Sequence, residues 1–384
     1  MNLNLSPNTS ATVSAESDIL SKLRGAFAAL ARHFSGLHRG GRNLTRALLS
    51  IGATALLVLL SGPRLLAAQS AGAGAAGWLL IANKGEHTLG LIDPVALRQI
   101  ATVPEDGVTG HEVAASPDGK RAFVPIYGDS GVGHAGTDGS LLRVIDLASR
   151  QIVGTVDFGK GVRPHCAVMG PKNGLLYVTT ELENSITVID PATLKIVETI
   201  PTGQSESHML AITRDGKRGY TSNVGPGTVS ALDLEAKKVV TIIPVSKTAQ
   251  RISLSVDDHW VFTSDQTKPQ LAVIDTTSNQ VSTWVQMPGT GYGTAPTPDG
   301  RWLIVALPGA NKVGVVDLKS MKLDRTLDVP RAPQEVLVRP DGAVAYVSCD
   351  ASRQVAVLDL KNWTVEKLID AGRGADGLAW APAQ

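Results

Sequence analysis

A histidine and a cysteine lie side by side at His165 and Cys166, within the stretch RPHCAVM. A neighbouring thiol and imidazole can act as a nucleophile with its general base, or supply two ligands to a metal ion. The flanking residues predict a β-strand, in which successive side chains point to opposite faces. We therefore expect the two side chains to point apart and not to cooperate. Cys349 is the only other cysteine, and we expect both thiols to be free and buried.

Seven polar residues at one repeated spacing form the second candidate. Each lies seven residues before the aspartate, or its equivalent, of a recurring Pro-Asp-Gly turn. A position that served packing alone would hold similar residues in every repeat, whereas this one varies and is always polar. We predict that these side chains bind a ligand. The set is His111, His165, His208, Arg251, Tyr292, Gln334 and Asp376.

Three members of this set are histidines in consecutive repeats. Three imidazoles with one open position are typical of catalytic zinc and of copper centres, so His111, His165 and His208 are candidate ligands of Zn²⁺ or copper. Neither HxH nor HExxH spacing occurs to place two ligands on one element. An organic or anionic ligand, and a polar ring that binds nothing, are the other interpretations.

Basic residues in the loops beside this set favour the anionic ligand. Arginine and protonated histidine pair well with carboxylates and phosphates. Acidic residues in the same loops, such as Glu105 and Glu206, weaken that signal. The basic residues are Lys160, Arg163, Lys247, Arg331 and Arg373.

One repeat carries an insertion of about ten residues at 127–140, YGDSGVGHAGTDGS. Its glycines predict a flexible loop, and long loops are often functional. Asp129, His134 and Asp138 make it a candidate lid or ion site. The spacing is not that of an EF-hand, and a tolerated surface insertion explains the loop equally well.

The elements that must position these residues follow from an internal repeat. A Val-Ile-Asp tripeptide and its variants recur, and short runs rich in Val, Ile, Thr and Tyr lie between them, such as LLYVTT and SITVID. Four such strands in each unit of about 42 residues indicate a propeller blade. The sequence therefore predicts an all-β, seven-bladed β-propeller with four-stranded antiparallel blades. The repeated aspartates are Asp93, Asp146, Asp190, Asp233, Asp275, Asp317 and Asp359.

The two ends of the propeller complete one blade. Residues 77–103 supply three strands, and the final segment GLAWAP matches only the first strand of a blade. We expect these pieces to pair and close the ring, with Trp380 beside Leu80. The predicted blades span 77–110 with 377–384, then 111–164, 165–207, 208–250, 251–291, 292–333 and 334–376.

Several repeats resemble a known family. LLYVTT, AYVSCD, SITVIDPATLKIVETIPTG and QVAVLDLKNWTVEKLIDAG are similar to the YVTN-type repeat of bacterial seven-bladed propellers, the YncE-like group. The resemblance covers about residues 77–384 and implies the propeller architecture. It says little about activity, because one fold hosts unrelated functions. Some propellers of similar appearance are lactonases.

The N-terminal part of the chain has the pattern of a leader. Residues 1–70 include an apolar run at 47–60 that follows Arg42 and Arg46 and precedes small residues, as in a secretory signal. Residues 71–76 are a short linker. We expect export to the periplasm or the medium, with membrane contact only through the signal or an uncleaved anchor. The remaining residues carry 29 basic and 33 acidic side chains, which gives no basic patch for nucleic acid.

Two classes of function remain open. The first is an exported binding or interaction protein, a monomer that holds a small, anionic ligand or a cell-envelope partner at the channel mouth. The second is a lactonase-like or metal-dependent hydrolase, or an oxidoreductase, with a histidine-lined site. No CxxCH motif occurs, so covalent heme attachment is excluded.

Overall fold

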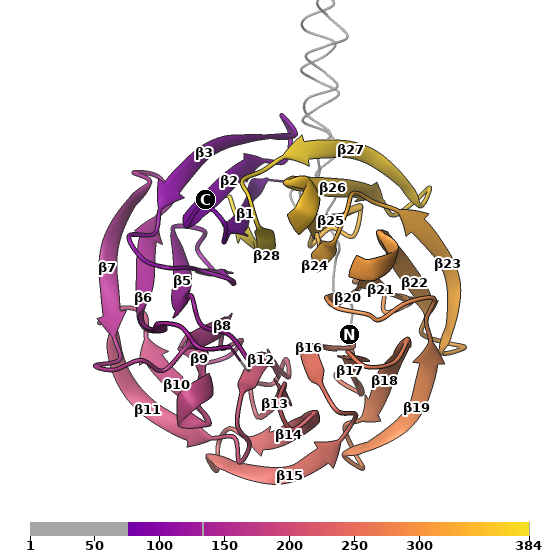
Figure 1. The fold of residues 1–384 in the computed structure, drawn as a ribbon, viewed down its shortest axis with the longest axis horizontal. Coiled ribbons are helices and arrows are strands. Elements are labelled where there is room, and N and C mark those ends of the chain that lie inside the picture. Colours follow the sequence, from indigo (N-terminus) through magenta and orange to yellow (C-terminus); the bar gives the residue numbers. More distant parts are fainter. Residues whose placement is uncertain (1–75, 133, 384) are drawn as a thin grey trace, which may run out of the picture. The chain divides into compact units, whose positions relative to one another are not determined.

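The computed structural model describes residues 76–132 and 134–383, which form a ring of seven four-stranded antiparallel sheets (Figure 1). This confirms the predicted fold class. The predicted leader at 1–70 lies outside the described residues. Within the described part of the chain, no helix is long and apolar enough to cross a membrane.

Each blade runs from an innermost strand at the axis to an outermost strand at the rim. The innermost strands of blades 1 to 7 are β28 (Ala375–Pro382), β4 (Ala114–Ala115), β8 (Pro164–Met169), β12 (Ser207–Ile212), β16 (Ala249–Leu254), β20 (Thr294–Pro296) and β24 (Pro333–Val338). The second strands are β1 (Gly77–Asn83), β5 (Arg121–Gly128), β9 (Leu176–Thr180), β13 (Arg218–Asn223), β17 (Trp260–Asp265), β21 (Trp302–Leu307) and β25 (Val344–Cys349).

The outer half of each blade is built in the same order. The third strands are β2 (Thr88–Asp93), β6 (Asp138–Asp146), β10 (Ser185–Asp190), β14 (Thr228–Asp233), β18 (Gln270–Asp275), β22 (Lys312–Asp317) and β26 (Gln354–Asp359). The outermost strands are β3 (Arg98–Pro104), β7 (Gln151–Asp157), β11 (Lys195–Pro201), β15 (Lys238–Pro244), β19 (Gln280–Gln286), β23 (Lys322–Asp328) and β27 (Thr364–Asp370). Three short 3₁₀ turns follow second strands: η1 (Glu181–Glu183), η2 (Pro308–Ala310) and η3 (Asp350–Ser352).

The repeated aspartates end the third strands and hold the turn to the outermost strand. In blade 1, Asp93 Oδ1 accepts the backbone N–H groups of Val95 and Ala96 at 2.8 and 2.9 Å. A short carboxylate that accepts nearby backbone N–H groups stabilises such a turn, and the other six aspartates accept in the same manner. These residues are therefore structural, which explains why they recur in every blade.

The ring is closed by the last strand. β28 pairs antiparallel with β1, with Trp380 opposite Leu79 and Ala379 opposite Leu80. Gly119, in the first turn of blade 2, has φ +66°, and a Cβ atom there would lie 1.9 Å from the carbonyl oxygen of Pro382. The C-terminal strand is thus fixed both by its own sheet and by the neighbouring blade.

The core lies between successive blades. Phe123, Tyr220, Phe262 and Tyr346 are fully buried at equivalent positions of the second strands, where they pack against residues of the next blade. Such interdigitated apolar surface supplies most of the stabilisation of the ring. Because every blade needs two neighbours, closure of the ring stabilises all seven.

Removal of residues 377–384 will destabilise the protein by more than about 5 kcal/mol, because β1 loses its partner strand and blades 2 and 7 lose their neighbour. Removal of Gln384 alone is the control and will change the unfolding free energy little. Chemical denaturation followed by tryptophan fluorescence measures both. A loss below about 1 kcal/mol in the longer truncation contradicts closure by this strand.

Candidate functional site at the axis of the ring

The innermost strands carry irregularities at the level of the predicted polar set. At this level, five innermost strands carry one residue more than the second strand of the same blade with which they pair. These strands are β8, β12, β16, β24 and β28. In β24, for example, Gln334 and Glu335 together lie opposite Ser348. Such β-bulges interrupt the alternation of side chains, and they are frequent beside functional sites. Two consecutive residues of one strand can therefore reach toward the axis.

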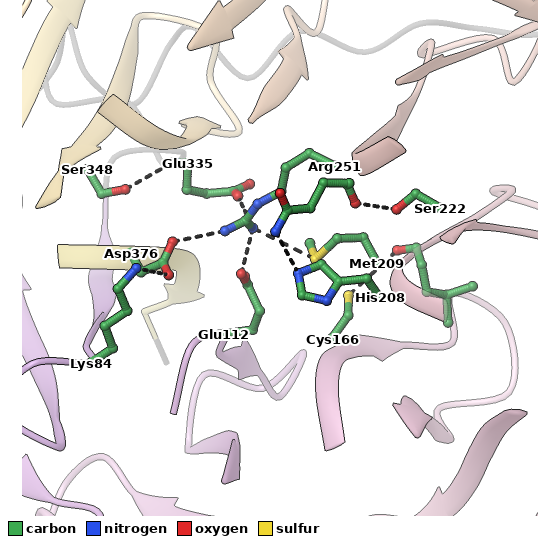
Figure 2. A network of polar contacts seen from close by, with 12 residues as sticks. Lys84, Glu112, Cys166, His208, Met209, Ser222, Arg251, Glu335, Ser348 and Asp376 are labelled. Atoms are coloured by element: carbon green, nitrogen blue, oxygen red, sulfur yellow. Dashed lines mark hydrogen bonds and ion pairs between the residues drawn. The ribbon is translucent and has the colours of Figure 1, made fainter. Parts of the chain in front are cut away.

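The guanidinium of Arg251, from blade 5, is the centre of the site (Figure 2). Its Nη1 lies 2.5 Å from Glu112 Oε1 and 2.5 Å from Glu335 Oε2, and its Nη2 donates to Asp376 Oδ1 at 2.9 Å. These carboxylates come from blades 2, 7 and 1. Arg251 is 2% exposed, so the side chains fill the axis at this level.

Two further blades contact the same guanidinium. Nη1 lies 3.8 Å from the sulfur of Met209 in blade 4, and the group stacks 4.9 Å from the ring centre of Tyr292 in blade 6. A cation over an aromatic face is stabilised by the ring quadrupole. One side chain of blade 5 thus contacts five of the other six blades.

A second cation extends the network to the mouth of the axis. Lys84, which follows β1, lies 3.0 Å from Asp376 Oδ2 and 3.1 Å from Asp350 Oδ2. We call the connected set the Arg251 cluster. Its members are Lys84, Glu112, Arg251, Glu335, Asp350 and Asp376.

Burial and pairing shift the pKa values of this cluster in opposite directions. Burial raises the pKa of Glu112 well above its ordinary value and also raises that of Glu335, despite the opposing effect of Arg251. Burial alone would raise the pKa of Asp376 too, but Lys84 and Arg251 lower it. Burial disfavours the charged Lys84, yet Asp376 and Asp350 raise its pKa overall. The cations and Asp376 therefore remain charged at neutral pH.

The other side of the axis holds a largely aromatic group that we call the histidine cluster. Tyr127 donates its hydroxyl to Glu181 Oε2 at 2.7 Å, and Glu181 Oε1 pairs with His208 Nδ1. With Nδ1–H donating to the carboxylate, His208 Nε2 accepts from Gln250 Nε2 at 3.3 Å. Both nitrogens of His208 are therefore used. The cluster comprises His111, Tyr127, His165, Glu181 and His208.

His165 lies at the centre of this group. Its ring is 3.6 Å from that of His208 and meets Tyr127 and His111 edge-on at 5.2 and 5.4 Å between centroids. It is 1% exposed, and its Nδ1 has no hydrogen-bond partner. Burial lowers the pKa of His165 well below 6.5 and that of His111 to about 4, so both are neutral at pH 7.

The predicted metal site stays a prediction. The structure brings the three histidines together, but His208 is committed to Glu181 and Gln250. Among residues 76–132 and 134–383, no group of three or more His, Cys, Asp or Glu side chains is arranged to hold a metal ion.

The remaining predicted residues divide between the site and its surroundings. Tyr292 packs its ring against the Arg251 guanidinium, whereas Gln334 donates to the carbonyl of Ala332 at 3.3 Å. Cys166 packs between blades 3 and 4, with Sγ 3.8 Å from the carbonyl of Leu210, and burial raises its pKa to about 12. His165 and Cys166 therefore do not form a base and its nucleophile, which agrees with the expectation that their side chains point apart.

The inserted loop is held by its own hydrogen bonds. Asp129 accepts the Thr137 N–H at 2.5 Å, and Gly131 pairs with His134 through the backbone. Asp138 accepts from Arg163 Nε at 2.6 Å. Asp138 is thus already paired with a cation of the protein, and the proposed ion site draws no support from this arrangement.

Six members of the two clusters were absent from the predicted set, and two reasons account for all of them except Tyr127. Glu112 and Glu335 each follow a residue of the predicted set, and strict alternation of side chains along a strand would point them away from the axis. Lys84 and Glu181 occupy the position directly after the second strand, which was not compared between blades. That comparison would have found them, because the position also holds Asp350, a third member of the site.

Glu105 is a separate buried carboxyl in the loop before the first strand of blade 2. Its Oε2 accepts the Gly110 N–H at 2.8 Å, while Oε1 has no partner and the side chain is fully buried. Burial raises its pKa to about 7, although the Gly110 bond opposes the shift. This group therefore titrates near neutral pH.

Comparison with known proteins places the chain in a family. The model of the Cytochrome D1 heme domain matches residues 136–372, more than half of the chain. The chain belongs to this family. A comparison with curated protein sequences gives no match. These findings support membership of a β-propeller family. The narrower resemblance to the YVTN-type repeat stays a prediction.

Solved structures share the fold of this Cytochrome D1 heme domain family member. One is hydrazine synthase of Kuenenia stuttgartiensis, with a TM-score of 0.64 and 19% identity, covering 74% of this chain and 93% of that one. Another is a functionally unknown protein from Desulfotomaculum acetoxidans, with a TM-score of 0.66 and 12% identity, covering 80% of this chain and all of that one. At such identities the likeness shows the fold alone.

The residues at the axis do not fit the heme that the family name implies. A heme needs an axial donor with a free lone pair and open space beside it. His208 has no free nitrogen, and the free Nδ1 of His165 is enclosed by neighbouring rings. We therefore derive no chemistry through a heme.

Glu105→Gln will stabilise the protein at alkaline pH. A carboxyl whose pKa is raised in the fold from 4.5 to about 7 contributes fully below pH 4.5 and loses that contribution as the pH rises through 7. The amide keeps the acceptor for Gly110 without the charge. At pH 8 the variant will exceed the wild type by up to about 3 kcal/mol, and near pH 4.5 the two will be equal.

Urea denaturation between pH 4.5 and 8 measures this difference, with Glu86→Gln, an exposed carboxyl, as the control. If the unfolding free energies of Glu105→Gln and the wild type differed by the same amount at every pH in that range, Glu105 would not titrate near pH 7 and the prediction would be wrong.

Proposed function

We propose that this propeller is an exported, monomeric interaction protein that docks a cell-envelope partner on its channel-mouth face. This is the face that carries the loops before each innermost strand and the loops between the second and third strands. The observation that carries the proposal is the closed axis. Arg251 and Asp376 are 2% exposed, and His165 is 1% exposed. A ligand in the channel would have to displace paired charges, whereas a partner on the surrounding loops would displace only water.

The loops of blades 2 and 3 on this face offer such a surface. Val108, before the first strand of blade 2, is 44% exposed, and Leu182 in η1 is 41% exposed. The inserted loop lies on the same face, where Arg163 joins it to blade 3 through Asp138 and the carbonyl of Gly131. Contiguous apolar surface marks protein-binding sites, and Val108 and Leu182 supply exposed apolar area in the loops of this face.

A small ligand is the second candidate, because the unpartnered Nδ1 of His165 leaves one buried polar group unsatisfied. The anionic form of that ligand has less support. Arg251 is surrounded by carboxylates, Lys160 pairs with Glu183 at 2.8 Å, and Arg163 pairs with Asp138. The lactonase-like or metal-dependent enzyme is less favoured still, because His208 is already bonded at both nitrogens.

Site-specific photocrosslinking in cells of the source organism tests the docking proposal. A crosslinking residue at position 108 or 182 will give one discrete adduct with an envelope protein, because both positions lie on the channel-mouth face. Position 95 is the control: Val95 is 76% exposed, but it lies in a turn on the opposite face. An equal adduct at position 95, or none at 108 and 182, would contradict the proposal.

A further inference from the structure

Two features at the axis of the propeller decide whether it can hold the heme that the family name implies. They are the histidines, whose nitrogens could ligate iron, and the buried network of charges beside them. We infer that this member of the Cytochrome D1 heme domain family does not bind heme, and that the Arg251 cluster fills and holds the axis in place of a cofactor. The inference concerns the axis alone and is independent of the partner proposed above.

The first support is the state of the imidazoles. His208 donates to Glu181 and accepts from Gln250, so it would have to break both bonds to ligate iron. His165 keeps a free Nδ1, but its ring contacts those of His208, Tyr127 and His111. His111 is partly exposed, and its ring stacks on Tyr127 at 4.7 Å. Each histidine is thus packed against another side chain of the site.

The second support is charge. Heme carries carboxylate groups on its periphery, which a protein binds with free arginine or lysine side chains. Here Arg251 contacts three carboxylates, and Lys84 contacts Asp376 and Asp350. A further anion would be repelled by Asp376, which stays charged, and would have to displace a carboxyl group from Arg251 or Lys84.

The third support is space and connectivity. Arg251 reaches from blade 5 to side chains of blades 1, 2, 4, 6 and 7 across the axis. Removal of one partner from a buried ion network leaves an uncompensated charge. A heme macrocycle could therefore enter the axis only by breaking the contacts that Arg251 makes with the other blades.

The experiment uses the full chain, purified from its source organism and then titrated with hemin and with free heme d1. As isolated, the protein will show no Soret band and less than about 0.1 iron per chain. Titration will give no saturable 1:1 complex tighter than about 10 μM. Absorption spectra and native mass spectrometry record both results.

Histidine variants separate an axial ligand from surface adsorption. Weak binding that is unchanged in His111→Ala, His165→Ala and His208→Ala marks adsorption and agrees with the inference. A stoichiometric complex that is lost in one of these variants, but kept in His87→Ala, would overturn it. His87 is an exposed histidine away from the histidine cluster, and so it serves as the matched control.

Discussion

The arrangement of this propeller depends on one buried cation. Arg251 contacts carboxylates of blades 1, 2 and 7, a sulfur of blade 4 and an aromatic ring of blade 6. Apolar contacts join each blade only to its neighbours, whereas this guanidinium joins blades across the axis. A buried ion is costly unless it is fully paired, so the cluster tolerates little displacement of any blade.

The same cation divides the axis into two chemically different halves. The half that contains Asp376 and Lys84 is charged and paired, and it extends from blade 7 across the closing strand to blade 1. In the half that contains His165, burial lowers the pKa values of His165 and His111 and so disfavours their imidazolium forms. Perturbed pKa values concentrated in one place often mark a functional site, but ion networks that hold a fold together perturb them too. The pairing of both terminal nitrogens of Arg251 with carboxylates favours the structural role.

The fold could be predicted from the sequence because it repeats. Seven aspartates in the same turn give the number of blades, and the unmatched strand at Trp380 gives the closure. The site could be predicted only in part. His165, His208 and Arg251 were found because their position varies between blades. Glu335 was missed because a bulge cannot be seen in a strand pattern, and Glu112 because it lies before the short strand β4. The pairing of Lys84 with Asp376 joins residues at opposite ends of the propeller, which no local rule reveals.

The unfolding free energy of Arg251→Met at pH 7 tests the central claim most directly. The account predicts a loss of about 3–5 kcal/mol, since Glu112 and Glu335 lose the cation they contact while Asp376 keeps only Lys84. It also predicts partial recovery when Glu112→Gln and Glu335→Gln are added. Arg214→Met, at an exposed arginine on the opposite face, will cost under about 1 kcal/mol. A loss in Arg251→Met no larger than in Arg214→Met would contradict the account.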